Sequence, residues 1–363
     1  MTLSSTNKTI LIAPLNWGLG HATRCIPIIK ALQENNYIPI IASDGIALEI
    51  LRKEFPYLLT LELPSYQIEY AKNGKNFKWK LLQNCPKMIE AVLEEKKTIK
   101  KWIKKYAIDG IISDNRLGVF SQKVPSVFIT HQLNVLTGST TWITSKLHQH
   151  IIKKYVECWV PDFSDFSGGT PNLTGKLGHI KKADFKVKYI GPLSRMNKKE
   201  ISKIYDLMVI LSGPEPQRGL LEEKLKNEIL NYDGKVVFIK GIVEKDQKKE
   251  QIENVTYYNF MNSRQLEQTF NESEIVLCRS GYTTIMDLVR LEKKVFFIPT
   301  PGQFEQEYLA EKYKKEGLVP YAKQDDFKMD AVLEIQNYKG LPHFENTIDW
   351  RDLFQVFENQ TQI

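Results

Sequence analysis

The feature that most constrains the fold of this chain is a series of short apolar segments, rich in Ile and Val, separated by stretches of helical periodicity. Strands covered by helices on both faces have this composition, because neither face meets water. Alternation of such strands with helices is typical of a parallel α/β sheet. In the first half of the chain these segments are TILIAPL, YIPIIAS, LLTLEL, IDGIIS, SVFIT, CWVP and VKYIG.

The same pattern starts again in the second half. A stretch at 191–206, GPLSRMNKKEISKIYD, joins a Gly-Pro turn to a lysine-rich polar run, which is typical of a domain boundary. A chain of 363 residues also exceeds what one core usually serves. The sequence therefore predicts two doubly wound α/β domains, at 1–195 and 196–345, and a C-terminal helix at 346–363 that packs back on the body. The strand-like segments of the second domain are LMVILSG, KVVFIKG, VTYYNF, IVLCRSG and KVFFIPTPG.

Composition excludes several classes of protein. An apolar content of 42% and a charged content of 26% are typical of a soluble globular protein. The four cysteines form no C-x-x-C pair, which indicates reduced thiols in a cytoplasm rather than a disulfide framework or a zinc knuckle. Without a signal peptide or about 18 consecutive apolar residues, we expect a cytoplasmic protein, soluble or peripheral at the inner face of the cytoplasmic membrane. A net charge of +7 without a nucleic-acid motif predicts no nucleic-acid partner.

Polar residues follow three of the predicted strands in the first domain. Ligands of open α/β sheets bind beyond the carboxyl ends of the strands, so we expect these residues to share one site. Gly18 and Gly20 lie in the turn APLNWGLGHATRC, where a missing Cβ admits a close approach, and His21 stands at the start of the next helix. The other candidates at these strand ends are Asn16, Asp114, Asn115, Arg116, His131 and Asn134.

Two plainer interpretations of the glycine turn also fit. The turn is close to the dinucleotide-binding pattern G-x-G-x-x-G, with Asp44 at roughly the spacing of the acidic residue that binds a ribose. Thr23 stands in place of the third glycine, which weakens this interpretation. The other alternative is a tight structural turn in which His21 only caps the helix.

The strand ends of the second domain carry groups suited to a phosphorylated ligand. Ser280, Gly281, Thr283 and Thr284 lie where a helix is predicted to begin, and N–H groups and hydroxyls there bind anions such as a diphosphate. Asp287 follows about one helical turn later, within reach of a ribose diol. The remaining candidates are Ser212, Gly213 and Arg279, and a cluster suited to several hydroxyl groups, Gln303, Gln306 and Glu307.

Together these motifs resemble those of the GT-B glycosyltransferases, and most closely the MurG type of glycosyltransferase family 28. GLGH matches the family's glycine-rich turn that ends in His, and HQLNVLTG keeps the His, Asn and Gly of its H-E-Q-N-x-x-x-G segment. RSGYTTIMD parallels R-A-G-A-x-T-x-x-E, with Asp287 in place of Glu, and PTPGQFEQE parallels a proline-bounded loop that ends in Gln-Gln. The likeness runs through nearly the whole chain in order, which makes it more specific than any single motif.

The resemblance implies two Rossmann-like domains that face each other across a cleft, with a UDP-sugar on the C-terminal domain and no bound metal or other cofactor. Asp287 would hold the ribose and the turn from Ser280 to Thr284 the diphosphate. The hydroxyls of a hexose or N-acetylhexosamine would meet Gln306 and Glu307. Further donor contacts are the backbone of Phe260 and Met261 for the base, and Arg195 and Arg279 for the base or a phosphate, although both arginines fit domain packing equally well.

The resemblance also implies that the N-terminal domain binds the acceptor and that transfer proceeds with inversion, which needs a base for the acceptor hydroxyl. His21 is the first candidate, because histidine titrates near neutrality. Asp114 is the rival, although an ion pair with Arg116 explains this carboxylate equally well. His131 fits a positioning role better than that of the base. A lipid-linked acceptor would bring the protein to an anionic membrane surface, in cell-envelope glycan or glycolipid synthesis.

Departures from the family pattern leave other functions open. The loop LSGPEPQRG stands in place of the family's Gly-Gly-Ser, and its two prolines remove potential phosphate-binding donors. Arg218 is the available substitute, although a surface arginine explains this residue equally well. GLGHATRC is also similar to the turn of a sugar-nucleotide hydrolase of the pseudaminic acid pathway, in which the same His activates water. A nucleotide-sugar hydrolase or epimerase, or a non-catalytic sugar-nucleotide-binding protein, would share the donor site. The sequence leaves the sugar and the acceptor undefined.

Two basic segments bear on the membrane. FKWKLL, at 77–82, interleaves Trp79, Leu81 and Leu82 with lysines, which fits either a helix packed on the sheet or contact with a membrane surface. EEKKTIKKWIKKY, at 94–106, places apolar residues at helical spacing among lysines, and we interpret it as a solvated helix face.

Overall fold

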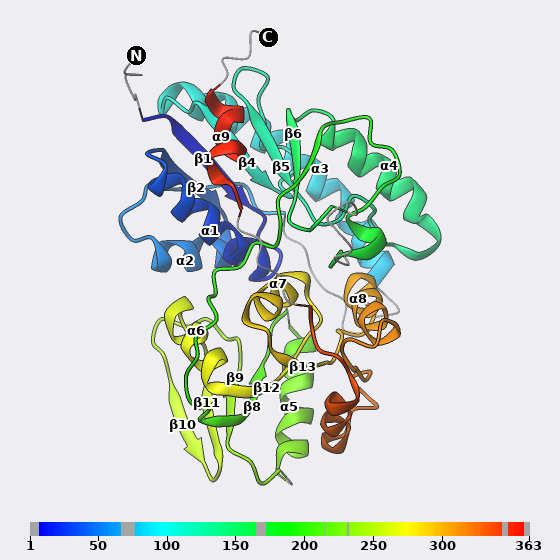
Figure 1. Cartoon of the computed structure of the whole chain (residues 1–363). Coiled ribbons are helices and arrows are strands. Elements are labelled where there is room, and N and C mark those ends of the chain that lie inside the picture. Colours follow the sequence, from blue (N-terminus) through cyan, green and yellow to red (C-terminus); the bar gives the residue numbers. More distant parts are fainter. Residues whose placement is uncertain are drawn as a thin grey trace. The chain divides into compact units, whose positions relative to one another are not determined.

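The computed structural model describes residues 7–66, 77–164, 172–213, 215–230, 232–342 and 348–358, with the backbone alone at 77–86 and 139 (Figure 1). The chain forms two compact units. The first runs to Leu193, apart from a segment that ends at Leu81, and takes in the chain from Asn346 onward. The second runs from Ser194 to Glu345. The sequence analysis placed this boundary after residue 195, and the C-terminal helix counts as part of the first unit.

The first unit is built on a parallel sheet with the strand order β3-β2-β1-β4-β5-β6-β7. Its strands are β1 (Thr9–Pro14), β2 (Ile38–Ser43), β3 (Thr60–Glu62), β4 (Gly110–Asp114), β5 (Ser126–Ile129), β6 (Glu157–Val160) and β7 (Val187–Tyr189). Its helices are α1 (Gly20–Glu34), α2 (Gly45–Glu54), α3 (Phe77–Lys105), α4 (Thr141–Ile152) and α9 (Trp350–Glu358), with short 3-10 turns at Gly138–Thr140 and Gly175–Leu177.

Both faces of this sheet are covered, as its largely apolar central strands require. On one face, Leu11 and Ile111 pack with Ile99 of α3, and Phe128 packs with Ile152 of α4. On the other, Trp159 of β6 contacts the rings of Phe354 and Phe357 of α9, with ring centroids 6.5 and 6.2 Å apart. Gly110 lies directly beneath the Phe357 ring, where any Cβ would clash. Within 94–106, Ile99 is buried and Trp102, Ile103 and Tyr106 pack against the same core, while every lysine except the half-buried Lys96 is exposed, which confirms the interpretation of this segment.

The second unit holds a sheet with the order β10-β11-β9-β8-β12-β13, in which every pair is parallel except the antiparallel pair of β10 and β11. Its strands are β8 (Tyr205–Ile210), β9 (Val236–Ile239), β10 (Lys249–Ile252), β11 (Val255–Tyr258), β12 (Ser273–Cys278) and β13 (Lys294–Phe297). Its helices are α5 (Gln217–Ile229), α6 (Ser263–Glu272), α7 (Tyr282–Leu291) and α8 (Phe304–Lys315), with a 3-10 segment at Met329–Asn337. Two doubly wound units of this kind confirm the predicted fold class.

Strand register determines which loops lie together. Asp114 pairs with Pro14 on one side and with Ile129 on the other, so the loops after β1, β4 and β5 leave the first sheet side by side. In the second sheet, Cys278 pairs with Ile210 and Phe297, which brings together the loops after β8, β12 and β13. None of the described helices is both long enough and apolar enough to span a bilayer.

Candidate active site

The candidate base, His21, lies in the first turn of α1, directly after the glycine turn. Gly18 takes a positive φ of 73°, which L side chains rarely adopt, and the N-cap residue Leu19 offers no side-chain cap. The imidazole Nδ1 of His21 is 2.9 Å from Oδ1 of Asp114, and 14% of the side chain is exposed. The predicted rivals for the role of base are therefore in direct contact.

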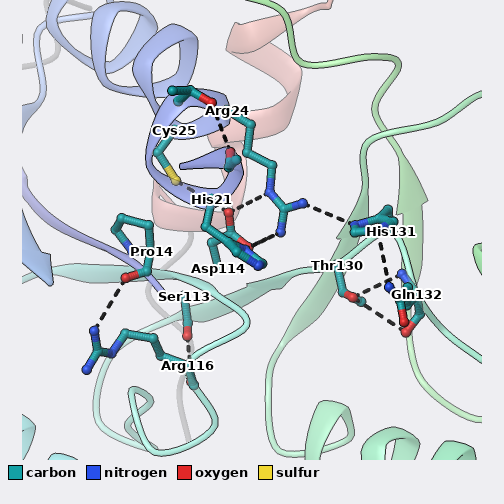
Figure 2. Close-up of polar contacts among 12 residues, drawn as sticks. Pro14, His21, Arg24, Cys25, Ser113, Asp114, Arg116, Thr130, His131 and Gln132 are labelled. Carbon is teal, nitrogen blue, oxygen red and sulfur yellow. Dashed lines mark hydrogen bonds and ion pairs between the residues drawn. The ribbon is translucent and has the colours of Figure 1, made fainter. Parts of the chain in front are cut away.

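Asp114 ends β4 and is completely buried beneath α1. Arg24 donates hydrogen bonds to both oxygens of this carboxylate: its Nε lies 2.6 Å from Oδ2, and one terminal nitrogen donates to Oδ1 (Figure 2). Burial by itself raises the pKa of Asp114, but the charges and hydrogen bonds of Arg24 and His21 outweigh it and hold this pKa well below its usual range. Asp114 therefore stays ionised at neutral pH, and its place suits orienting His21 rather than taking a proton from a substrate.

The surroundings of His21 favour the uncharged form of its imidazole. Burial lowers its pKa first, the charge of Arg24 lowers it further, and Asp114 opposes both. A lowered pKa keeps the imidazole neutral at physiological pH, which is the form that accepts a proton. The sequence prediction of His21 as a base is chemically consistent with this geometry.

His131 joins the same group of side chains. It follows β5, is almost fully buried, and its Nδ1 lies 3.1 Å from a terminal nitrogen of Arg24. Figure 2 shows Arg24 between His21 and His131, above Asp114. Sequence reasoning missed Arg24. The available signal was its spacing, since residues three apart on a helix share a face and Arg24 follows His21 by three.

Arg116 does not belong to this group, and the predicted ion pair between Asp114 and Arg116 is wrong. Its buried guanidinium pairs with Glu95 of α3 at 2.6 Å and with Asp44 at 2.7 Å. Asn115, which stands between Asp114 and Arg116 in the sequence, has a φ of 57°. This left-handed conformation ends the strand alternation that would keep the two flanking side chains on one side of the sheet. Arg116 thus links the loops that carry Asp44 and Arg116 itself to α3. The ion pair with Arg116 explains Asp44 without a bound ribose.

Two of the three asparagines predicted to bind an acceptor, Asn16 and Asn134, make hydrogen bonds that hold loops in place. The amide of Asn16 donates to Asp44 at 3.2 Å and accepts from the backbone N–H of Ala47 at 3.3 Å. The amide nitrogen of Asn134 donates to the carbonyls of Lys176 and His179, at 2.7 and 3.0 Å, which uses both of its hydrogens. These bonds give both amides a structural role, and acceptor contact by either one stays a prediction. For Gly18, Gly20 and Asn115, acceptor contact stays a prediction.

In the second unit, two predicted motifs lie side by side at helix N-termini. The Oγ of Ser280 donates to the backbone carbonyl of Gln306 at 2.8 Å, and the Oε1 of Gln306 accepts from the N–H of Thr300 at 2.9 Å. Gly281 is the N-cap of α7 and supplies no side-chain cap, so the first N–H groups of this helix suit an anion. Thr283 and Thr284 lie partly exposed in its first turn, and Ser212 and Gly213 follow the adjacent strand β8.

Asp287 lies farther along α7 and is nearly buried. Its Oδ1 accepts a 2.6 Å hydrogen bond from Ser194, and burial raises its pKa to about 6. Arg195 donates to Ser263 at 2.8 Å. Gln303 is the N-cap of α8, and Glu307 in its first turn accepts from the N–H of Gly302 at 2.8 Å. These residues stand where the sequence analysis placed them, and their contacts with a donor stay predictions.

The predicted phosphate contact of Arg279 is not supported. Arg279 is buried, and its terminal nitrogens donate to the carbonyls of Ile298, Pro299 and Gln217 and to the side chain of Gln324. Burial lowers its pKa to about 9. The packing alternative is therefore the correct one, because these bonds turn the guanidinium toward the interior.

Other residues predicted to contact the sugar donor also bind partners within the protein. Arg218, the proposed substitute for missing phosphate donors, pairs with Glu215 and Glu222, so its charge is already balanced. The N–H of Phe260 donates to Asn259 at 3.0 Å, and its carbonyl accepts from Gln247 at 2.7 Å. The sulfur of Met261 accepts from Thr269 at 3.3 Å. A base bound at this segment would have to share or exchange these bonds.

Among the described residues, no group of three or more His, Cys, Asp or Glu side chains is placed to hold a metal ion. The expectation that the reaction needs no metal stays a prediction.

Comparison with known proteins adds independent findings. Residues 217–338 match the C-terminal domain of glycosyltransferase family 28. Two curated relatives are both described as UDP-N-acetylglucosamine–N-acetylmuramyl-(pentapeptide) pyrophosphoryl-undecaprenol N-acetylglucosamine transferase. The one from Haemophilus ducreyi is 19% identical over 245 residues, which is 64% of each chain. The one from Clostridium perfringens strain SM101 is 23% identical over 331 residues, 87% of this chain and 85% of the relative.

Solved structures agree on the fold. The glycosyltransferase of kitacinnamycin superposes with a TM-score of 0.59 at 13% identity, over 91% of this chain and 90% of that one. MurG from Acinetobacter baumannii superposes with a TM-score of 0.50 at 12% identity, over 98% of this chain and 91% of that one. Likeness at this identity shows the fold, and the family match adds the activity. The chain is a glycosyltransferase of the GT-B fold, similar to the MurG type.

Proposed function

We propose that this chain transfers a hexose, or an N-acetylhexosamine, from a UDP-sugar to a hydroxyl of a lipid-linked acceptor, with inversion, at the cytoplasmic face of a membrane. The observation that carries the proposal is the contact between the partly exposed His21 and the buried Asp114 at the carboxyl edge of the first sheet. The printed names of the curated relatives support a UDP-linked donor and a lipid-linked acceptor, in cell-envelope synthesis.

The proposed chemistry uses His21 as the base. With its Nδ1–H donated to Asp114, the ring presents a bare Nε2, which takes the proton of the acceptor hydroxyl. The acceptor oxygen forms a bond to C1 of the sugar while the bond from C1 to the diphosphate oxygen breaks on the opposite side. The proton stays on His21, whose positive charge Asp114 stabilises, until it passes to solvent. UDP leaves with the electron pair of the broken bond.

In this proposal the second unit holds the donor. The N–H groups at the start of α7, from Ser280 to Thr284, face the diphosphate and offset the charge that grows on it, so that no bound metal is needed. Asp287 binds the ribose diol. The sugar hydroxyls meet the polar cluster at the start of α8, Gln303, Gln306 and Glu307.

A helix face of the first unit supports a membrane partner. Trp142, Ile143 and Leu147 of α4 are 72%, 53% and 62% exposed, and Lys146 lies among them on the same face. Basic residues continue this surface beyond the helix at 153–154, where Lys153 pairs with Asp184. No Asp or Glu occurs between Asp114 and Glu157 in the sequence. An exposed face of Trp, aliphatic and basic residues fits an anionic bilayer surface. We call this surface, residues 142, 143, 146, 147, 150, 153 and 154, the α4 face.

The α4 face takes the place of the segment at 77–82 as the proposed membrane contact, because the side chains of Trp79, Leu81 and Leu82 lie outside the described residues. The transferase names of the relatives favour transfer over the alternatives of a hydrolase, an epimerase or a non-catalytic binder.

The test is release of UDP from a panel of UDP-hexoses and UDP-N-acetylhexosamines, with and without a lipid extract of bacterial membranes. We expect release that depends on the extract and is lost in His21→Ala. Release of equal rate without any extract would show a hydrolase. Binding of UDP-sugars without turnover under either condition would show a non-catalytic binder.

A further inference from the structure

Arg24 makes an unusual set of contacts for a residue in the first turns of a helix. It is 1% exposed, and its one guanidinium reaches three side chains from three separate elements: Asp114 at the end of β4, His21 on α1 and His131 after β5. An arginine on a helix ordinarily keeps its charged head in water. Burying it beside two histidines and a carboxylate is costly unless the geometry is exact, so the arrangement indicates a specific role.

We propose that Arg24 is the positioning residue of the His21–Asp114 pair: it fixes both oxygens of the carboxylate, joins His21 to His131, and cancels the buried negative charge so that His21 stays unprotonated. The catalytic role of Arg24 rests on the proposed function. The contacts of Arg24 and its effect on the charge of His21 do not depend on that function.

The charge balance follows from the groups that face His21. They are Arg24 from its own helix, Asp114 from β4, and His131 from the loop after β5. A carboxylate beside a histidine favours the imidazolium, because opposite charges attract. Arg24 removes most of this effect, since a cation bound to both carboxylate oxygens leaves a neutral pair next to the ring. Burial, the largest effect on His21, then outweighs what is left of the attraction to Asp114 and disfavours the charged imidazole.

The hydrogen count gives Arg24 a second effect. A guanidinium only donates, so a hydrogen bond from Arg24 to the Nδ1 of His131, 3.1 Å away, requires this nitrogen to be bare. The Nδ1 of His21 lies 2.7 Å from a donor on Arg24 and 2.9 Å from an acceptor on Asp114. It satisfies one of them at a time. With Nδ1–H turned to Asp114, Nε2 is bare and basic; with Nδ1 bare toward Arg24, Nε2 carries the proton.

Arg24 therefore competes with Asp114 for the same ring nitrogen. An imidazolium, which carries protons on both nitrogens, must give up the contact with Arg24, so Arg24 also favours release of the proton that His21 has taken. Lysine cannot replace this set of bonds, because its single ammonium has no planar fork to hold two oxygens while it reaches two rings.

The experiment is an NMR titration of the His21 ring in protein labelled with ¹³C-histidine. The chain has six histidines, and the His21 signal is the one lost in His21→Gln. We expect Arg24→Met to raise the pKa of His21 by about 1–3 pH units, the usual effect of a charge at this distance. An unchanged His21 pKa in folded Arg24→Met would overturn the proposal. Because the readout is a titration, it decides the proposal whether or not the chain transfers a sugar.

A second pair of variants keeps the test decisive if Arg24→Met does not fold. Asp114→Asn leaves the charge of Arg24 uncompensated, and Arg24→Met/Asp114→Asn removes both charges, which buried sites tolerate better than one. We expect the His21 pKa to be lower in Asp114→Asn than in the double variant by about one pH unit or more. Equal values would show that Arg24 does not act on His21.

Activity supplies a readout that separates positioning from simple support of the fold. In Arg24→Lys, which keeps the charge and loses the fork, we expect kcat to fall about 10-fold or more while the acidic limb of the pH profile of kcat/KM stays in place. In Arg24→Met the limb should move to higher pH. A residue that only supports the fold would lower activity in both variants at every pH alike, and that result would contradict the proposal.

Discussion

The candidate sites of the two units handle charge in opposite ways. In the first unit, charged side chains are buried and paired at the site itself, where Arg24 holds Asp114 against His21. In the second unit, Arg279, which follows β12, is turned inward to backbone carbonyls. The edge of this sheet presents the N-terminus of α7, which has no side-chain cap. Side-chain charge suits the movement of a proton, and backbone N–H groups suit the binding of a diphosphate. The difference supports the proposal that the chemistry belongs to the first unit and the donor to the second.

The comparison is tested most strongly at His21. His21→Ala should lower kcat by about 10²–10⁴-fold, the usual contribution of a positioned base, and leave UDP binding nearly unchanged because the proposed donor groups lie in the second unit. Steady-state kinetics and calorimetry with UDP measure the two effects. His21→Gln keeps much of the shape without the basicity and should be almost as impaired.

The matched variant is Asp114→Asn, which keeps the buried shape and removes the charge. It should reduce kcat as well, because Arg24 then holds Nδ1 of His21 without competition and the proton lies on Nε2, the nitrogen that has to be bare in a base. If Asp114→Asn abolished turnover while His21→Ala kept most of its rate, Asp114 would be the base, and the histidine would serve only to shape the turn.

A second prediction concerns buried charged residues of the first unit that lie outside the site of His21 and Asp114. Arg116 pairs with Glu95 and Asp44 in the interior, and we interpret these pairs as structural. Arg116→Met should lower the free energy of unfolding by about 3–5 kcal/mol, because it leaves two buried carboxylates without their cation. Urea unfolding followed by tryptophan fluorescence measures this, since the tryptophans other than Trp79 lie in the first unit.

Arg52→Met is the control for Arg116→Met. Arg52 pairs with Glu49 on the exposed surface of α2, where such a pair contributes about 0–1 kcal/mol. Equal losses in the two variants would contradict the structural interpretation of Arg116. Loss of activity in Arg116→Met at full stability would return this residue to the site.

A third prediction concerns the donor residue Asp287. If its carboxylate binds the ribose diol, Asp287→Ala should weaken UDP binding by about 1.5–3 kcal/mol, the range for a hydrogen bond to a charged group. Because burial raises the pKa of Asp287 to about 6, UDP affinity should fall as the pH drops below 6 and the carboxylate takes up a proton. Calorimetry across this range measures both effects. An unchanged UDP affinity in folded Asp287→Ala would place the nucleotide elsewhere.

Asp287 also predicts a change of stability with pH, and its sign is definite. The folded state binds this proton more tightly than the unfolded chain, whose Asp titrates near 3.9. Ionising Asp287 therefore costs stability progressively as the pH rises from about 4 to about 6, and the cost is complete above 6. Asp287→Asn lacks the titrating proton and should lose this part of the pH dependence. An identical profile in wild type and Asp287→Asn would show that the pKa is not raised.

The sequence predicts a strand when burial of that strand requires a run of apolar residues. The strands covered on both faces were all predicted, because an unbroken apolar run is what such burial requires. The strand β10 was missed: KEQI is exposed throughout and pairs along one edge only, so its residues carry no apolar pattern. The strand-end rule found His21, Asp114 and His131, because strand order alone brings their loops together.

The errors at the sites have a different cause. The rule that groups strand-end residues says nothing about which way a side chain turns. A positive φ at Asn115 sends Arg116 away from Asp114, and buried carbonyls draw Arg279 inward. Arg24 was missed for the converse reason, since a helical arginine ordinarily lies in solvent. Partners distant in the sequence decided each of these cases.

The last and smallest predicted effect tests whether the two units also differ in their surfaces. Trp142→Ser/Ile143→Ser/Leu147→Ser removes the exposed apolar part of the α4 face, each side chain being already in solvent, so the fold should be retained. Co-sedimentation with liposomes that contain anionic lipid should fall about 10-fold, and UDP binding should not change. Leu333→Ser, at a leucine of the second unit that is 70% exposed, is the control and should bind liposomes like the wild type. If the triple variant unfolded, the α4 face would belong to the core, and if it bound liposomes fully while folded, the membrane contact would lie on another surface. Loss of binding in the triple variant alone would assign the membrane to the unit that carries the base, which is where a lipid-linked acceptor has to arrive.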